Sequence, residues 1–176
     1  MRKVIVVESP AKAKKIKTFF NDNTVVISSY GHIIDLPKEQ ISIDIQNNFE
    51  PNYQPIRDKK QIIKELRNYS KNYNVLLAAD DDREGDAIAW HCGNIMKLDF
   101  NKKNRILFHE VSKKAIMKAI KNVHQLNMNS VNAQQGRRII DRLVGYSLSP
   151  LLWKFINTKH SGLSAGRVQS TLLLIL

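Results

Sequence analysis

Five acidic side chains fall within seven positions of an otherwise basic sequence, in the stretch LLAADDDREGDAIAWHC at residues 76–92. Asp80 and Asp82 in this stretch are two positions apart, so in an extended segment their side chains point the same way. Two carboxylates about 4 Å apart repel by roughly 4 kcal/mol at an effective dielectric near 20, and such a pair therefore requires a cation or a shared proton. An all-oxygen set without His or Cys at matching spacing favours a hard ion, Mg²⁺ before Mn²⁺ or Ca²⁺.

Two simpler interpretations of the acidic stretch compete with a metal site. Acidic residues are common at helix starts because they complement the helix dipole, and acidic runs are often merely solvated. Asp86 fits a helix start, and Asp81 has no assigned role. An EF-hand calcium loop is excluded, because its twelfth position is His91 where a bidentate glutamate is required, and because a strand is predicted to precede it.

Glu8 adds a further carboxylate through the elements that position it. Residues 3–7 (KVIVV) are a β-branched run, which predicts a strand buried on both faces, as in a parallel sheet. Ser9 and Pro10 then predict the cap and the first position of a helix. An acid at the end of this strand shares a sheet edge with Asp80, where metal-assisted phosphoryl chemistry would use it; the alternative is an ordinary surface acid.

Strand and helix patterns alternate four times in the first part of the chain. The predicted strands are 3–7, 25–28, 75–79 and 105–108, and the predicted helices are 10–20, 59–69, 86–97 and 112–123. This alternation predicts an α/β domain at residues 1–125, with a four-stranded, mostly parallel sheet flanked by helices. Residues 37–60 are polar and contain three prolines, so we expect an irregular excursion there.

From residue 126 to residue 176 the pattern changes to successive helices, which predicts the start of an all-α domain. The predicted helices are 131–148, 150–156 and 165–176, the last two capped by Ser149 and Ser164. The final run, STLLLIL, has no cap and nothing to cover its apolar face. We therefore expect the polypeptide to continue beyond it.

Positive charge is concentrated in the second part of the chain. Of the formal net charge of +12, residues 1–100 carry +1 and residues 101–176 carry +11. This asymmetry favours a polyanionic partner, although a solvated lysine face is the alternative. A single cysteine rules out an internal disulfide, and the N-terminal apolar run is too short for a signal peptide or a membrane span. We expect a cytoplasmic protein with no membrane partner.

Longer motifs resemble a known family. An acid after the first strand followed by a D-x-D-x-E-G cluster after a later strand resembles the Toprim domain of topoisomerases, bacterial primases and some nucleases. The fuller strings are VVESPAKAKKI (6–16), SSYGHIIDLP (28–37), DDDREGDAIAWH (80–91), NAQQGRRIIDRLVGYSLSPLLWK (132–154) and LSAGRVQS (163–170). Together they resemble the N-terminal part of bacterial type IA DNA topoisomerase I, over nearly the whole chain.

The resemblance implies ATP-independent relaxation of negatively supercoiled DNA by single-strand cleavage, strand passage and religation through a 5′-phosphotyrosine. It implies that Glu8 handles the proton of the leaving 3′-oxygen and that Lys12 stabilises charge on the reacting phosphate. Asp80 and Asp82 would hold Mg²⁺, with Glu8 close enough to share the ion and Glu84 tuning the site. The partner implied is single-stranded DNA within a negatively supercoiled duplex, which places the protein at the nucleoid.

Basic and aromatic side chains in the second part of the chain suit DNA binding. Arg138 and Arg142 share one helix face, with Tyr146 a turn further on, a pattern that suits phosphates and an unstacked base; surface ion pairs with Asp141 are the alternative. The resemblance assigns the single-strand groove to His32, Arg137, Arg138, Asp141, Arg142, Tyr146, Lys154, Ser164, Ala165, Gly166, Arg167, Val168 and Gln169. Gly166 would admit a DNA backbone, and Arg167 would act at the scissile phosphate.

The chain departs from the family in ways that limit this expectation. None of its five tyrosines lies in the Arg-Thr-Asp-Ser context of the family's nucleophile. We therefore expect remaining domains of the same polypeptide to carry that tyrosine, and this chain alone to be inactive in relaxation. Gly136 stands where a helix former is usual. Two alternatives are another Toprim-type phosphodiester enzyme, either a primase or a nuclease, and a non-catalytic single-strand-binding fragment.

Overall fold

Three parallel strands form the main sheet of the computed structural model, which describes residues 2–21, 23–156 and 163–166. The strands are β1 (Lys3–Val7), β2 (Thr24–Ser28) and β7 (Asn74–Leu77), in the order β2-β1-β7. The central strand β1 is buried from Val4 to Val7, which confirms the strand predicted from its β-branched run. Residues Val4 to Val7 pair in register with residues Val25 to Ser28 of β2.

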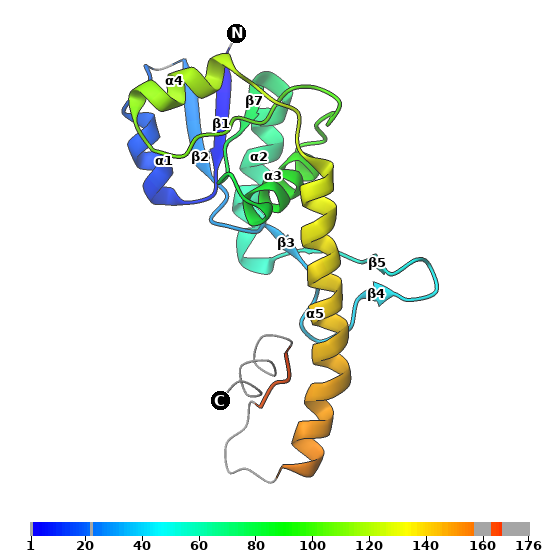
Figure 1. Ribbon diagram of the computed structural model, residues 1–176. Helices are drawn as coiled ribbons and strands as arrows, with labels where there is room; N and C mark the ends of the chain where they lie inside the picture. The colour runs from blue at the N-terminus through cyan, green and yellow to red at the C-terminus, as the bar shows by residue number, and fades with distance from the viewer. Residues whose placement is uncertain (1, 22, 157–162, 167–176) are drawn as a thin grey trace. The chain divides into compact units, whose positions relative to one another are not determined.

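Helices cover both faces of this sheet (Figure 1). The four are α1 (Pro10–Lys17), α2 (Lys60–Asn72), α3 (Arg83–Ile95) and α4 (Lys113–Lys121). Figure 1 shows α1 and α4 on one face of the sheet and α2 and α3 on the other. The core on the α1 and α4 side includes Ile5, Ile16, Leu76, Ile106 and Ile116. The predicted parallel sheet flanked by helices is thus present.

The helix starts follow the capping residues in the sequence. Ser9 caps α1, its Oγ accepting a hydrogen bond from the Lys12 backbone N–H at 3.3 Å, and Pro10 takes the first helical position. Ser112 caps α4 in the same way, accepting from the Ala115 N–H at 3.2 Å. The short helix η1 (Arg57–Lys59) leads directly into α2.

The predicted fourth strand at residues 105–108 is wrong. Within the described residues this segment makes only isolated bridges, from Arg105 to Leu77 and from Arg105 to His124. The Ile106 N–H donates to the Leu77 carbonyl at 2.9 Å, but β7 itself ends at Leu77, so no longer ladder forms. The sheet therefore has three strands where four were expected.

Contacts divide the chain into two units. Unit 1 comprises Met1–Asp35 and Gln54–Gln134, and unit 2 comprises Leu36–Tyr53 and Gln135–Leu176. Most of the excursion predicted at residues 37–60 thus belongs to unit 2. The excursion holds little regular structure. Its strands β4 (Ile43–Asp44) and β5 (Glu50–Pro51) pair with each other in unit 2. Its strand β6 (Gln54–Pro55) pairs in unit 1 with β3 (Ile34–Asp35), which precedes the excursion.

One helix, α5 (Met128–Phe155), replaces the two helices predicted between residues 131 and 156. Pro150 lies inside this helix, where it removes one backbone donor. Ser149 does not cap a new helix, because it lies inside α5, and its Oγ accepts a hydrogen bond from the Ala165 backbone N–H at 3.0 Å. Of the third predicted helix, residues 167–176 lie outside the described residues. A search of the described helices for one long and apolar enough to cross a bilayer found none.

Candidate functional site

Glu8 and Asp80 meet at the carboxyl edge of the sheet in unit 1. Their strands β1 and β7 are parallel neighbours, with Val6 opposite Leu77, so the residues that follow them emerge at one edge. Lys12, one turn into α1, reaches both acids: its Nζ donates to Glu8 Oε1 at 2.6 Å and to Asp80 Oδ1. We refer to these three residues as the sheet-edge cluster.

The segment after β2 fixes the backbone of Glu8. Ser28 Oγ donates to the Glu8 carbonyl at 3.1 Å, and the Gly31 N–H donates to the same oxygen at 2.9 Å. Tyr30 and Gly31 both have left-handed backbones, with φ of 55° and 81°. A glycine costs little at such an angle, whereas a tyrosine is strained, and such strain is typical of functional segments.

Arg105 holds the backbone from which Asp80 projects. Its guanidinium, only 1% exposed, donates from Nη1 to the Ala79 carbonyl at 2.7 Å and from Nη2 to the Asp80 carbonyl. Its charge is balanced by Asp86, whose Oδ1 lies 3.0 Å from Arg105 Nε. Sequence reasoning assigned Arg105 only to a strand. The available signal was a charged residue beginning an otherwise apolar run, RILF, that follows an acidic stretch.

Gly85 allows α3 to approach the Asp80 backbone. A Cβ at position 85 would lie 2.1 Å from the Asp80 carbonyl oxygen, so no other residue fits without a backbone shift. The N–H of Gly85 donates to Asp82 Oδ1 at 2.6 Å, which makes Asp82 the N-cap of α3. This helix was predicted to start at Asp86, but it starts at Arg83. Part of the Asp82 carboxylate is therefore occupied by helix capping.

The sheet-edge cluster divides charge unequally among its three members. Burial, and next a hydrogen bond shared with Asp80, raises the pKa of Glu8. The hydrogen bond with Glu8, assisted by Lys12, lowers the pKa of Asp80. Burial alone would lower the pKa of Lys12, but its hydrogen bonds to both acids outweigh burial and raise that pKa. Of the two acids, Glu8 is thus the one that more readily takes up a proton, while Asp80 stays ionised and Lys12 stays an ammonium.

A cavity of about 300 Å³ beside the cluster is lined by Lys12 and by Asp80, Asp81 and Asp82. No three His, Cys, Asp or Glu side chains among the described residues are grouped closely enough to hold a metal ion. Mg²⁺ does not require such a cage, because proteins usually hold it by one or two carboxylates plus waters and substrate phosphates. The oxygen-only donor set therefore fits Mg²⁺. The Lys12 ammonium also places positive charge beside two of these carboxylates, those of Glu8 and Asp80.

Glu84 points into a second set of contacts within unit 1. Its carboxylate contacts His32 Nε2 and accepts a hydrogen bond from the side-chain amide of Gln134. His32 Nδ1 also lies 3.1 Å from His91 Nδ1, so one of these two nitrogens carries the shared proton. His91 is buried, as a packing residue would be, but it also orients His32. Glu84 and His32 are thus brought together, a contact that sequence reasoning missed.

Asp81, which had no assigned role, has a histidine neighbour on the surface. Its Oδ2 lies 3.6 Å from His109 Nε2, and the His109 side chain is 86% exposed. Exposed pairs of this kind contribute little to stability. The structure therefore gives Asp81 a neighbour without giving it a clear function.

In unit 2, the side chains predicted to bind DNA also hold the chain itself. Arg142 donates to the carbonyls of Leu36 and Pro37 at 2.9 and 2.7 Å, and the Tyr146 hydroxyl donates to the Lys38 carbonyl at 2.6 Å. The Arg142 guanidinium also lies 5.5 Å from the Tyr146 ring centre. These two residues therefore fix the segment after residue 35, a structural task that the helical spacing did not reveal.

The other predicted groove residues show fewer contacts. Arg137 Nε lies 3.8 Å from Asp141 Oδ2, a surface ion pair, whereas the alternative considered from the sequence paired Asp141 with Arg138. Arg138 has an interaction partner, and Lys154 Nζ lies 5.5 Å from the Phe155 ring. Of the predicted turn, Ser164 to Gly166 are non-helical. Arg167, Val168 and Gln169 lie outside the described residues.

Comparisons with known proteins agree with the motifs. Residues 3–111 match the Toprim domain family, and residues 125–176 match a family described as DNA topoisomerase. A solved structure of full-length topoisomerase I from Thermotoga maritima is similar over 98% of the chain, with 48% identity and a TM-score of 0.91. The chain spans 29% of the length of that protein.

Proposed function

Because the chain belongs to the Toprim-containing, type IA family of bacterial DNA topoisomerases, we propose that it supplies the acid–base and metal-binding part of an enzyme that relaxes negatively supercoiled DNA. The reaction is ATP-independent cleavage of one strand, strand passage and religation, through a 5′-phosphotyrosine. The observation that carries this proposal is the sheet-edge cluster, in which Lys12 bridges Glu8 and Asp80 at the ends of two parallel strands.

Glu8 transfers the proton in this proposal. Burial and the hydrogen bond with Asp80 raise the pKa of Glu8, so its carboxyl holds a proton more readily than an exposed glutamate does. A protonated Glu8 can give that proton to the 3′-oxygen as the strand is cleaved and can take it back during religation. The hydrogen bonds from the Ser28 hydroxyl and the Gly31 N–H to the Glu8 carbonyl keep the backbone of Glu8 in place.

Lys12 and the two aspartates handle negative charge. The raised pKa of Lys12 keeps its ammonium charged beside the position of a phosphate at the sheet edge. Asp80 and Asp82 would hold Mg²⁺, with Glu8 near enough to share it. When bound, the ion supplies positive charge that orients and neutralises a DNA phosphate, chiefly for religation. Glu84 supports the site through its contact with His32.

Single-stranded DNA is the partner in this proposal. Its contacts are assigned to His32 and to basic residues of α5 and the following turn, including Arg138, Lys154 and Arg167. Arg142 and Tyr146 contribute by holding the segment after residue 35 in place, besides any contact with DNA. The nucleophilic tyrosine belongs to other domains of the same polypeptide, since no tyrosine here has the family's sequence context.

The test is relaxation of negatively supercoiled plasmid by the polypeptide that joins this chain to the tyrosine-bearing domains. Glu8→Gln keeps the side chain's size but cannot donate an acidic proton, so relaxation should fall about 100-fold or more. Glu65→Gln, an exposed acid on α2, is the matched control and should relax plasmid at the normal rate. Equal rates for the two variants would remove Glu8 from the reaction.

A nuclease is the alternative that the same assay can detect. This 176-residue chain alone should neither relax nor nick plasmid, because it lacks the attacking tyrosine. Mg²⁺-dependent nicking that disappears in Asp82→Asn would instead favour a Toprim nuclease and contradict the topoisomerase proposal.

A further inference from the structure

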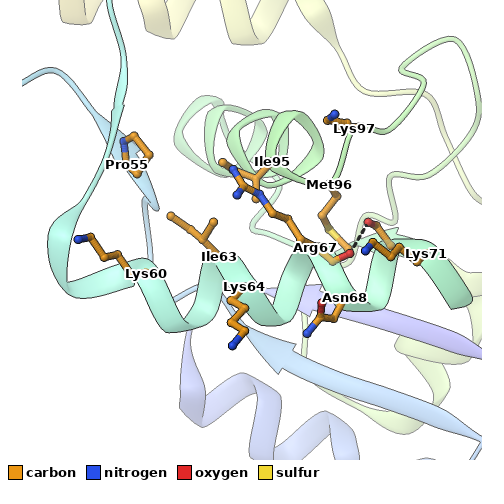
Figure 2. A pocket seen from close by; sticks show the side chains of 11 residues that line it. Pro55, Lys60, Ile63, Lys64, Arg67, Asn68, Lys71, Ile95, Met96 and Lys97 are labelled. Atoms are coloured by element: carbon orange, nitrogen blue, oxygen red, sulfur yellow. Dashed lines mark hydrogen bonds between the residues drawn. The ribbon is translucent and has the colours of Figure 1, made fainter.

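A groove of about 910 Å³ lies between α2 and the end of α3 in unit 1, and shares no residue with the sheet-edge cluster (Figure 2). Its floor includes the buried side chains of Ile63 and Met96. Figure 2 shows Ile63 and Arg67 directed from α2 toward Ile95. The charged residues that line it are Lys60, Lys64, Arg67, Lys71 and Lys97.

The four lining cations on α2 form a row along the length of the helix, with Lys64 and Arg67 directed to different sides of it (Figure 2). Positions 60, 64, 67 and 71 follow the spacing of a single helix face, and the eleven residue steps from one end of the row to the other correspond to about 16 Å of helix. At 3.4 Å of axis per phosphate, a row of this length spans about five phosphates of one strand of a duplex. The row therefore matches a nucleic-acid backbone in length.

No acid competes for these charges. None of the eleven lining residues is acidic, and none of the five cations forms an ion pair within the part of the chain that the structure describes. All five are exposed. The one acid of α2, Glu65, does not line the groove. A row of exposed, unpaired cations is the electrostatic pattern expected of a polyanion site.

The lining also favours duplex over single-stranded DNA. Single-strand sites combine basic side chains with aromatic rings on which bases stack. The eleven lining residues contain no aromatic side chain, and the polar ones besides the cations are Asn68 and Ser70. Such a surface can contact phosphates but offers no platform for unstacked bases.

Lys97 occupies a position where lysine is unusual. Its φ is 54°, and the bonds from the Leu98 N–H to the Gly93 carbonyl and from the Lys97 N–H to the Asn94 carbonyl close α3 in the way that normally uses glycine. A side chain kept at a strained position needs a compensating role. Its place in the lining of the groove supplies one.

We propose that this basic groove binds the phosphate backbone of duplex DNA, without reading sequence. The proposal rests on the proposed function only in taking DNA as the substrate. Negatively supercoiled DNA presents duplex on both sides of any opened single strand, so a duplex contact would hold the substrate beside the reacting strand. A groove without stacking side chains would contribute affinity that depends strongly on salt.

The test is fluorescence anisotropy of a 20-base-pair duplex titrated with the 176-residue chain between 50 and 200 mM salt. The groove variant is Lys60→Gln, Lys64→Gln, Arg67→Gln and Lys71→Gln together. The control carries Lys113→Gln, Lys114→Gln, Lys118→Gln and Lys121→Gln on α4, which removes the same charge from another helix. Loss of four phosphate contacts should make the slope of log affinity against log salt shallower by about 3.6, at 0.9 per phosphate.

The groove variant should therefore lose the steep salt dependence that the control keeps. Equal changes in both variants would show that only net charge matters and would overturn the proposal. A loss confined to a single-stranded 20-mer, or to a glutamate-rich peptide, would assign the groove to that ligand instead of duplex. Lys97→Gly, which removes one cation and relieves the strained position, provides a well-folded second variant and should lower the slope by about 0.9.

Failure of this proposal is distinguishable from failure of the proposed function. The groove variant leaves the sheet-edge cluster intact and should bind Mg²⁺ as the unmodified chain does. Conversely, Asp80→Asn should leave duplex binding by the groove unchanged. If the groove variant binds both duplex and Mg²⁺ normally, the groove proposal is rejected and the proposed function is not.

Discussion

Gly85→Ala should destabilise the protein, although alanine is the better helix former. The added Cβ would lie 2.1 Å from the Asp80 carbonyl oxygen and 2.8 Å from the Asp80 carbonyl carbon and nitrogen. These are backbone atoms that no rotamer change can move. Overpacking costs about 1–3 kcal/mol, and a clash with backbone belongs at the upper end, while helix propensity returns about 1 kcal/mol. The net loss should be about 2 kcal/mol, or a fall in Tm of about 4–8 °C.

The assay is urea unfolding followed by far-UV circular dichroism, with Gly136→Ala as the matched control. Gly136 also lies inside a helix, but a Cβ there would meet nothing within 4 Å. The control should therefore gain up to about 1 kcal/mol from helix propensity alone. An unfolding midpoint for Gly85→Ala equal to or above that of the unmodified chain would contradict the close approach of α3 to Asp80.

Three further predictions follow from other contacts. Arg105→Met leaves Asp86 buried without its partner and should lower the free energy of unfolding in urea by about 3–5 kcal/mol. The double variant Arg105→Met with Asp86→Leu should recover part of this loss. Equal stability of the single and double variants would contradict the buried pair. Burial raises the pKa of the Cys92 thiol to about 12, above its unfolded value near 8.5. The stability that comes from keeping this thiol neutral is therefore complete below about pH 8.5 and is lost as the pH rises toward 12. The urea midpoint should fall less over that range in Cys92→Ala than in the unmodified chain, and an equal fall would contradict the assignment. Arg142→Ala frees the Leu36 and Pro37 carbonyls and should speed tryptic cleavage after the exposed Lys38 about tenfold, whereas Arg137→Ala should not; equal cleavage would show that Arg142 does not fix the segment.

Local patterns were sufficient to predict the elements that carry the cluster. The β-branched run of β1, the Ser9–Pro10 start of α1 and the helix predicted at 112–123 depend on neighbouring residues, and each is present in the structure. The meeting of Glu8 with Asp80 also follows, because parallel strands end at a common edge. The Toprim resemblance agrees with the family match over residues 3–111.

Features that depend on distant partners were not predictable in this way. The Arg105 side chain satisfies carbonyls 25 and 26 positions earlier, and no periodicity encodes that contact. Glu84 contacts His32 and Gln134, which are 52 and 50 positions away. The predicted break at Pro150 is also absent, since α5 continues through it and the Ser149 hydroxyl accepts a hydrogen bond from the distant Ala165 N–H. Tertiary contacts decided each of these cases against the local signal.

Binding of Mg²⁺ to the 176-residue chain, measured by isothermal titration calorimetry, tests the role of the sheet-edge cluster most directly. Asp80→Asn keeps the side chain's size but removes the charge, so affinity should fall at least about tenfold, since losing a ligand should cost no less than losing a supporting residue. Asp58→Asn, an exposed acid of η1, should bind as the unmodified chain does. Unchanged affinity in Asp80→Asn would contradict a metal site at the sheet edge.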